Sequence, residues 1–189
     1  MTLTLLVALG LIIVVALYAT AIYNNLVRLK HTVAKAWSNI DVSLKQRHDE
    51  LPKLVAVCKE YMGYEKETLE RVVRARGEVY SARARGDVRG LGSAETELRA
   101  GLDRLLALAE NYPDLKANQS FQQLSQRISQ LEDTIADRRE LYNDSANLNN
   151  IRLEQFPDTL VAKLFAFKPF ELLEFKNARG DVDIAKLFA

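Results

Sequence analysis

Hydrophobic and polar positions divide this chain into an unbroken apolar run at the N-terminus and a longer stretch in which the two kinds alternate. Residues 3–23 contain no charged side chain. At about 1.5 Å per residue, a helix of that length crosses a hydrocarbon core of roughly 30 Å. The pattern therefore predicts a single transmembrane helix that contacts membrane lipid through Leu3, Leu5, Leu6, Val7, Leu9, Leu11, Ile12, Ile13, Val14, Val15, Leu17 and Ile22.

A cleaved signal peptide is the alternative interpretation of the apolar run. Residues 19–21 offer small side chains of the kind found at cleavage sites, but no basic residue precedes the run and it is longer than a signal sequence. We therefore expect an anchor that stays attached. Basic residues follow the run, with Arg28 and Lys30 ahead of the first acid, Asp41. By the positive-inside rule, residues 24–189 lie in the cytoplasm and the chain is a single-pass protein of the inner membrane.

After the apolar run, apolar residues recur every three or four positions, which is the period of a helix and not of a strand. This spacing predicts helices with apolar positions over residues 26–44, 54–79, 98–109 and 121–142, the last with a heptad-like coiled-coil seam. No proline or glycine separates the first stretch from the apolar run. One long helix is therefore expected to leave the bilayer, enter the soluble domain and couple the two mechanically.

Proline and glycine mark the expected ends of these helices. Pro52 ends or kinks the first helix, or lies in the first turn of the next one, because it has no N–H and restricts the residue before it. A glycine cluster predicts the main loop, over residues 84–93, with Ser93 as a candidate cap of the next helix. A further break is expected at Pro113.

Helices joined by short polar loops bury their apolar stripes against one another. The expected fold is therefore all-α, an N-terminal transmembrane helix followed by an antiparallel bundle of about four long helices. We divide the chain into an anchor over residues 1–23, a bundle domain over 24–170 and a C-terminal tail over 171–189. A composition of 48% hydrophobic and 27% charged residues is that of a folded protein.

The composition also excludes several kinds of chemistry. A net charge of +1 gives no global field to attract nucleic acid. The single cysteine, Cys58, rules out an intramolecular disulfide and a cysteine zinc site, and it fits the helical pattern as a core residue. His31 and His48 have no further ligands at metal-binding spacing, and the glycine cluster has no P-loop lysine. We expect no enzyme activity, metal, cofactor or small-molecule substrate.

Several strings of residues resemble LemA family proteins. They are YNNLV (residues 23–27), AWSNIDVSLKQR (36–47), LPKLV (51–55), AENYPDLKAN (109–118), RRELYND (138–144) and the FP pair at 156–157. The string over residues 109–118 is the most diagnostic. The resemblance covers about residues 1–170, including the apolar run, whereas NARGDVDI (177–184) departs from the usual ending of the family.

This resemblance implies a bacterial, membrane-anchored helical bundle with a short outside N-terminus and a cytoplasmic domain. No enzymatic activity is established for the family. Some relatives act in shaping magnetosome membranes, and family members often sit in genomes beside a heat-shock-type membrane zinc metalloprotease. These associations suggest a class of role and transfer no site residues.

Two charged or polar regions are candidates for contacts with partners. In the turn over residues 111–118, Tyr112, Asp114 and Lys116 either form a tight connection between helices, which each residue type suits, or present a recognition surface. Six arginines between residues 71 and 89 form either a solvated helix end or a surface for anionic lipid, nucleic acid or an acidic partner. Interspersed acids and the lack of stacking aromatics favour the solvated helix end.

A third candidate region is aromatic. Six of the seven phenylalanines lie toward the C-terminus, and the first few are expected to cover the open end of the bundle. As an alternative, Phe165, Phe167 and Phe170 belong to a docking surface for a partner or for the membrane interface. The six are Phe156, Phe165, Phe167, Phe170, Phe175 and Phe188.

The sequence favours a non-enzymatic scaffold at the membrane, either a homo-oligomer or a protein that positions membrane-protein partners. An adaptor or regulator of a membrane enzyme, such as a quality-control metalloprotease, is the alternative. Both readings follow from several surfaces suited to contacts and from the absence of a recognisable catalytic motif.

Overall fold

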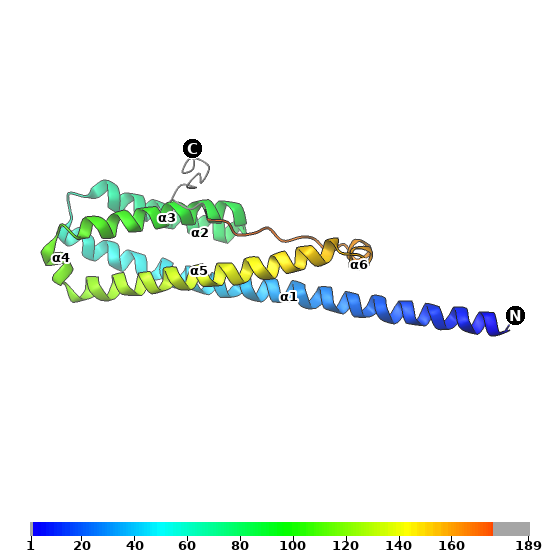
Figure 1. Cartoon of the computed structure of the whole chain (residues 1–189). Helices are drawn as coiled ribbons and strands as arrows, with labels where there is room; N and C mark the ends of the chain where they lie inside the picture. The colour runs from blue at the N-terminus through cyan, green and yellow to red at the C-terminus, as the bar shows by residue number, and fades with distance from the viewer. Residues whose placement is uncertain (1, 176–189) are drawn as a thin grey trace, which may run out of the picture. The chain divides into compact units, whose positions relative to one another are not determined.

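The computed structural model describes residues 2–175, and these form six helices and no strand (Figure 1). This confirms the all-α prediction. The helices are α1 (Thr2–Tyr61), α2 (Lys66–Arg85), α3 (Val88–Ala109), α4 (Pro113–Ala117), α5 (Gln119–Glu154) and α6 (Asp158–Leu164).

The chain divides into two compact units. Among the described residues, unit 1 consists of residues 2–38 and Glu140–Leu172, and unit 2 consists of residues 39–139 together with residues 173–175. The two longest helices, α1 and α5, contribute residues to both units. Each unit thus combines segments that lie far apart in the sequence.

Unit 2 is an antiparallel helical bundle built from the second part of α1, from α2 and α3, and from the first part of α5 (Figure 1). Apolar positions spaced three and four apart on each helix turn inward, as the periodicity predicts. Cys58 is a buried free thiol in this core, which confirms its predicted place. The buried side chains of the core include Leu44, Leu51, Leu54, Leu69, Val72, Leu91, Leu98, Leu105, Ile128 and Ile135.

Helix α1 passes through Pro52 and ends nine residues later, at Tyr61. Proline has no N–H to donate to the carbonyl four residues earlier, which here belongs to His48. Arg76 of α2 supplies the missing donor, because its Nε lies 3.0 Å from the His48 carbonyl oxygen. The first helix therefore neither ends nor reverses at Pro52, and a neighbouring helix satisfies the acceptor that the proline leaves open.

The predicted loop over residues 84–93 is wrong, because the connection between α2 and α3 is much shorter. Gly86 ends α2 in the left-handed conformation with φ +65°, and Asp87 begins α3 by accepting a hydrogen bond from the Gly90 N–H at 2.8 Å. Asp87 therefore takes the capping role that we expected for Ser93. The later glycines of the cluster lie inside α3.

Gly92 is needed for close packing rather than for a turn. A Cβ atom at this position would lie 2.1 Å from the carbonyl oxygen of Glu174. The helix must therefore carry a glycine where the C-terminal segment crosses it. This explains why a glycine cluster that looks like a loop is compatible with a helix.

The connection between α3 and α5 agrees with the sequence. Helix α3 ends at Ala109, and Pro113 occupies the first turn of the short helix α4. Tyr112, before the proline, lies outside the helical region, with φ −118° and ψ 86°. Asn118 caps α5, since its Oδ1 accepts a hydrogen bond from the Phe121 N–H at 3.1 Å.

Unit 1 begins with the apolar part of α1, whose large side chains from Leu3 to Tyr18 are each more than half exposed. This helix is long and apolar enough to cross a membrane. Ile22 differs from the other predicted lipid contacts, because it is only 7% exposed and packs with Leu26, Val161 and Ala162. The last turn of the apolar run therefore packs against α6.

Helix α6 ends in a Schellman motif built around an alanine. Ala166 adopts φ +54°, the Phe167 N–H bonds the Ala162 carbonyl at 2.9 Å, and the Ala166 N–H bonds that of Lys163 at 3.3 Å. The turn directs the chain into the segment over residues 165–170. A tilted ring pair, Trp37 with Tyr142 at 5.3 Å between centroids, also lies in unit 1.

Candidate functional site

The most deeply buried charges form one network in unit 2. Arg47 of α1 is 1% exposed and pairs through its two terminal nitrogens with Glu95 of α3 and Glu132 of α5. Arg99 of α3 extends the network, with its Nε 3.1 Å from Glu132. One buried guanidinium therefore joins three helices of the bundle.

The network has the properties of a structural element. Burial raises the pKa of Glu95, and the adjacent Arg47 acts in the opposite direction. The carboxylates of Glu95 and Glu132 are both held by arginine, so neither is free to act as a general base. Sequence reasoning missed this network, because Arg47 stands in the polar run KQRHDE and looks like a surface residue.

Two further polar contacts join α1 to α2. Arg83 forms a two-pronged ion pair with Asp41, with Nη2 to Oδ2 at 2.8 Å, and this hydrogen bonding lowers the pKa of Asp41. Arg76 Nη2 lies 2.8 Å from His48 Nε2, and the His48 ring stacks on Tyr80. Burial, followed by the charge of Arg76, lowers the pKa of His48.

The arginine-rich stretch is therefore used largely within the bundle. Arg83 and Arg76 bond residues of α1, and Arg71 forms an exposed ion pair with Glu97 of α3 at 2.8 Å. These contacts use the three arginines between helices of the bundle, while a role of the stretch as a partner surface stays a prediction. They give Arg71, Arg76 and Arg83 a structural role that the sequence of their own helix does not reveal.

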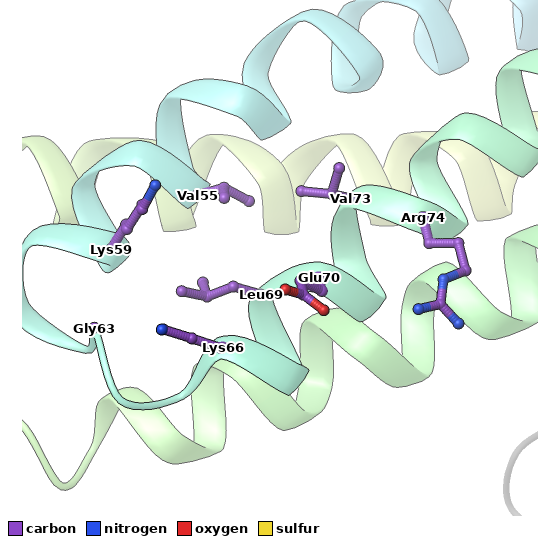
Figure 2. Close-up of a pocket in the computed structure, with 8 residues that line it drawn as sticks. All are labelled: Val55, Lys59, Gly63, Lys66, Leu69, Glu70, Val73 and Arg74. Atoms are coloured by element: carbon purple, nitrogen blue, oxygen red, sulfur yellow. The ribbon is translucent and has the colours of Figure 1, made fainter.

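A groove lies between the end of α1 and the start of α2, and it encloses about 590 Å³. Figure 2 shows the apolar side chains of Val55, Leu69 and Val73 between the two helices, with basic side chains around them. We call this the α1–α2 groove, and it is lined by Val55, Lys59, Gly63, Lys66, Leu69, Glu70, Val73 and Arg74. The floor of this groove is apolar and its rim is mainly basic. Such a groove suits a partner that carries an apolar side chain flanked by carboxylates.

In the predicted recognition turn, Tyr112 and Lys116 make separate local contacts. Tyr112 is half-buried, and its hydroxyl lies 3.4 Å from Glu65. Asp114 and Lys116 are exposed, and Lys116 pairs with Glu110. These local contacts supply a structural reason for Tyr112 and Lys116, while the recognition role of this surface stays a prediction.

The structure brings the predicted phenylalanines of residues 165–170 together. Tyr23 of α1 packs against Phe165 and Phe167, with centroid distances of 4.6 and 5.8 Å. The backbone of Phe170 is held by the side chain of Asn150. Phe156 is 81% exposed, so the expectation that the first phenylalanines cover the end of the bundle is wrong for this one. Phe188 lies outside the described residues.

These aromatics surround a cavity of about 550 Å³ in unit 1. We call it the aromatic cavity, and α1, α5 and the segment after α6 form its walls. Asn149 of α5 is 1% exposed, and its Oδ1 accepts no hydrogen bond from any described residue. The lining residues are Tyr23, Val27, Lys30, His31, Asn149, Phe165, Ala166, Phe167, Lys168, Pro169 and Phe170.

Within residues 2–175 we find no cluster of three or more histidine, cysteine or acidic side chains placed to hold a metal ion. Burial raises the pKa of the Cys58 thiol to about 11, so the thiolate needed for nucleophilic chemistry is scarce at neutral pH. The chemistry that the described residues offer is therefore that of binding surfaces and ion pairs.

Comparison with known proteins gives a consistent result. A model of the LemA family matches residues 36–185. The match includes the diagnostic string over residues 109–118. It continues past residue 170, where we expected this chain to depart from the family.

Curated relatives extend the similarity to nearly the whole chain. The magnetosome proteins MamQ 1 and MamQ 2 of Paramagnetospirillum magneticum are each 26% identical to it over 204 residues, which covers 95% of this chain and 75% of theirs. Protein LemA of Metamycoplasma hominis is 29% identical over 171 residues, which covers 87% of this chain and 74% of its own. Coverage of 95% means that the similarity to the magnetosome proteins reaches into the apolar part of α1.

Proposed function

The chain belongs to the LemA family, and from that premise we propose that it is a membrane-anchored, non-enzymatic scaffold that self-associates or positions partner proteins. The observation that carries the proposal is the contrast between the two ends of α1. Its N-terminal part exposes nearly every apolar side chain, while its C-terminal part is buried in a helical bundle. A helix of this kind suits an anchor that presents a folded domain at a bilayer surface.

The distribution of polar groups supports a role without chemistry. The buried acid Glu95 and the half-buried Glu132 are held by arginines, and the buried thiol of Cys58 is not activated. The features open to a partner are the α1–α2 groove and the turn that contains Tyr112. Binding surfaces without convergent reactive groups are what a scaffold requires.

We place the folded domain on the cytoplasmic side of the inner membrane. Arg28, Lys30 and Lys35 follow the apolar run, and their side chains are exposed on α1. Positive charge next to an apolar span favours retention on the cytoplasmic side. Accessibility of Lys30 and Lys35 to a membrane-impermeant amine reagent in intact cells would contradict this orientation.

The relatives named as magnetosome proteins favour a second candidate, in which the chain helps to organise a membrane. This candidate and the scaffold differ in what the protein contacts. A membrane-organising element contacts mainly lipid and copies of itself, whereas an adaptor contacts another membrane protein such as a quality-control protease.

Crosslinking in native membranes with an amine-reactive reagent, followed by mass spectrometry, tests these proposals. A scaffold is expected to give reproducible links to itself or to a small set of membrane proteins. In a double variant, Lys59→Arg and Lys66→Arg, the charge of the α1–α2 groove is kept but its reactive amines are lost. Links made through the groove should disappear in this variant and persist in the matched Lys35→Arg control.

The contradicting result is equally definite. A chain that gives no more links than an unrelated single-pass protein at the same abundance is not a scaffold. Links only between copies would select the self-associating form. Links to one other protein would select the adaptor.

A further inference from the structure

We infer that the aromatic cavity binds the headgroup of an anionic phospholipid that also carries hydroxyl donors, of which phosphatidylglycerol is the simplest example. This inference rests on the membrane anchoring proposed above. It assigns a lipid site to the folded part of unit 1, in addition to the general contact between lipid and the apolar part of α1.

Charge complementarity is the first argument. Lys30, His31 and Lys168 line the cavity from α1 and from the segment after α6. Among the described residues that form its walls there is no aspartate or glutamate. Two lysines and an imidazole that line one cavity, with no carboxylate among the described lining residues, suit a phosphate group, which accepts several hydrogen bonds and carries negative charge.

An orphaned acceptor is the second argument, and it is independent of charge. Asn150 is fixed in orientation, because its Oδ1 accepts from the Phe170 N–H at 2.9 Å and its Nδ2 donates to the Phe170 carbonyl at 2.8 Å. Asn149 Nδ2 donates to the same Asn150 Oδ1 at 3.4 Å, which leaves Asn149 Oδ1 as the atom without a donor.

A buried acceptor without a partner carries a free-energy cost, so its persistence calls for an explanation. A phosphate has no hydroxyl donor at neutral pH when both of its ester positions are occupied. The glycerol hydroxyls of phosphatidylglycerol supply donors next to the phosphate. One headgroup can therefore satisfy the lysines and Asn149 together.

The position of the cavity along α1 is the third argument. Tyr23, the last residue of the apolar run, forms part of its wall, and Lys30 follows about 10 Å further along the helix at 1.5 Å per residue. Side chains on a helix lean toward its N-terminus, which here is the membrane end. The amine of Lys30 is therefore directed toward the headgroup layer, as in lysines that snorkel.

The apolar surroundings suit the rest of a lipid molecule. Tyr23, Phe165 and Phe167 form an aromatic wall that adjoins the cluster of Ile22 and Leu26. Beside it, Leu160 and Leu164 of α6 are 58% and 77% exposed. Exposed apolar side chains on a short helix next to a membrane span are typical of segments at the interface.

The test is native mass spectrometry of the full chain released from detergent micelles, with three lipids of identical acyl chains. Phosphatidylglycerol has charge and hydroxyls, phosphatidylmethanol has charge alone, and phosphatidylcholine has no net charge. We expect phosphatidylglycerol to bind most tightly and phosphatidylcholine least. The double variant Lys30→Gln with Lys168→Gln loses two contacts between a lysine and the headgroup. We expect it to bind phosphatidylglycerol about 30-fold more weakly.

A matched control separates a site from general attraction. The double variant Lys35→Gln with Lys163→Gln loses the same charge, and neither lysine lines the cavity. It should bind phosphatidylglycerol like the unmodified chain. Equal weakening in both double variants would overturn the inference, as would equal binding of the three lipids.

A separate measurement, the preference between two anionic lipids, tests the role of Asn149. Asn149→Leu should abolish the preference for phosphatidylglycerol over phosphatidylmethanol, which we expect to be about fivefold for one hydrogen bond. The lysine variants should keep this preference while binding both lipids weakly. A preference that persists in Asn149→Leu would contradict the role of the orphaned acceptor.

Two further results distinguish the lipid inference from a soluble phosphate ligand and from a failure of the membrane anchor. Inorganic phosphate that competes as effectively as the lipid would reassign the cavity to a soluble phosphate compound and overturn the lipid inference. Extraction of the chain from membranes by alkaline carbonate would disprove the anchoring itself. A chain that stays in the membrane but shows no lipid preference disproves only the cavity inference.

Discussion

The two units differ in how the polar groups in their interiors find partners. In unit 2, the guanidinium of Arg47 has carboxylate partners from two other helices, and the carbonyl that Pro52 leaves open has a donor from Arg76. In unit 1, the buried Asn149 keeps an acceptor that no described residue satisfies. Unit 2 also has one buried nitrogen without a partner among the described residues, His48 Nδ1, but His48 does not line the α1–α2 groove, whereas Asn149 lines the aromatic cavity. An unsatisfied atom next to a cavity indicates a part that accepts something from outside.

Removing Arg47 should have the largest effect on stability. In Arg47→Met, Glu95 remains buried without its main partner, which typically costs about 3–5 kcal/mol of unfolding free energy. Chemical denaturation of the full chain in detergent, followed by far-ultraviolet circular dichroism, measures this loss. The exposed pair of Arg71 with Glu97 provides the control, and Arg71→Met should cost less than about 1 kcal/mol.

A second variant shows whether the partner or the charge matters. Adding Glu95→Leu to Arg47→Met removes both buried charges, and most of the lost stability should return. If the double variant is as unstable as the single one, the cost comes from packing around Arg47 and the contrast between the units is weakened.

The contact between Arg76 and the His48 carbonyl should give the next largest effect. Arg76→Met should cost about 1–2 kcal/mol in the natural chain, because a partly buried carbonyl loses its donor. In a Pro52→Ala background, residue 52 has an N–H that can restore the helical bond. The cost of Arg76→Met should then be smaller, and a double-mutant cycle on unfolding free energies measures the difference. Additive costs would show that Arg76 does not compensate for the proline.

The left-handed residues that follow α2 and α6 allow a reciprocal test. Gly86 and Ala166 occupy equivalent left-handed positions after α2 and α6. Left-handed conformation costs roughly 1 kcal/mol for a residue with a Cβ. Gly86→Ala should therefore destabilise the chain by about that amount, and Ala166→Gly should stabilise it similarly, both measured by denaturation. A loss of stability in Ala166→Gly would show that the alanine methyl contributes packing in the aromatic cavity.

Asn149→Leu should leave stability unchanged or raise it by up to about 1 kcal/mol in lipid-free detergent, because a buried acceptor without a donor is removed. This outcome is the opposite of that expected for Arg47→Met. A clear loss of stability would mean that Asn149 has an internal structural role and that the two units are alike.

The smallest expected effect is a dependence of stability on pH through His48. Burial and the charge of Arg76 lower the pKa of His48, while Asp49 opposes the shift and Arg83 adds to it. The unfolded chain therefore takes up a proton at higher pH than the folded chain, and stability falls as the pH drops below about 6.5. His48→Gln should flatten this decline, and a decline of equal slope in the variant would assign it to other groups.

Much of the fold could be predicted from the sequence, because periodic apolar positions report directly on helices. The span over residues 3–23, the end of α3 before Pro113 and the Asn118 cap all follow from local chemistry. The failures occur where a distant residue overrides a local signal. In the sequence Gly92 resembles a loop residue, but in the structure it leaves room for the carbonyl oxygen of Glu174. Pro52 resembles a helix end, but Arg76 donates the hydrogen bond that the proline cannot donate.

The candidate sites were predictable only in part for the same reason. Phe165, Phe167 and Phe170 could be identified as a group because they are close in sequence. Their convergence with Tyr23 and Asn149 depends on helices that are distant in the chain, and no spacing reveals it. Arg47 was missed because a polar neighbourhood in sequence says little about burial once helices pack.

The chain has one tryptophan and one cysteine, and each unit contains one of them. Trp37 packs against Tyr142 in unit 1, so its fluorescence reports on the packing there. Cys58 is buried in unit 2, and a thiol reagent modifies it only when that core opens. The natural protein therefore carries two built-in reporters, and the opening of each unit can be timed separately without a label or an introduced mutation.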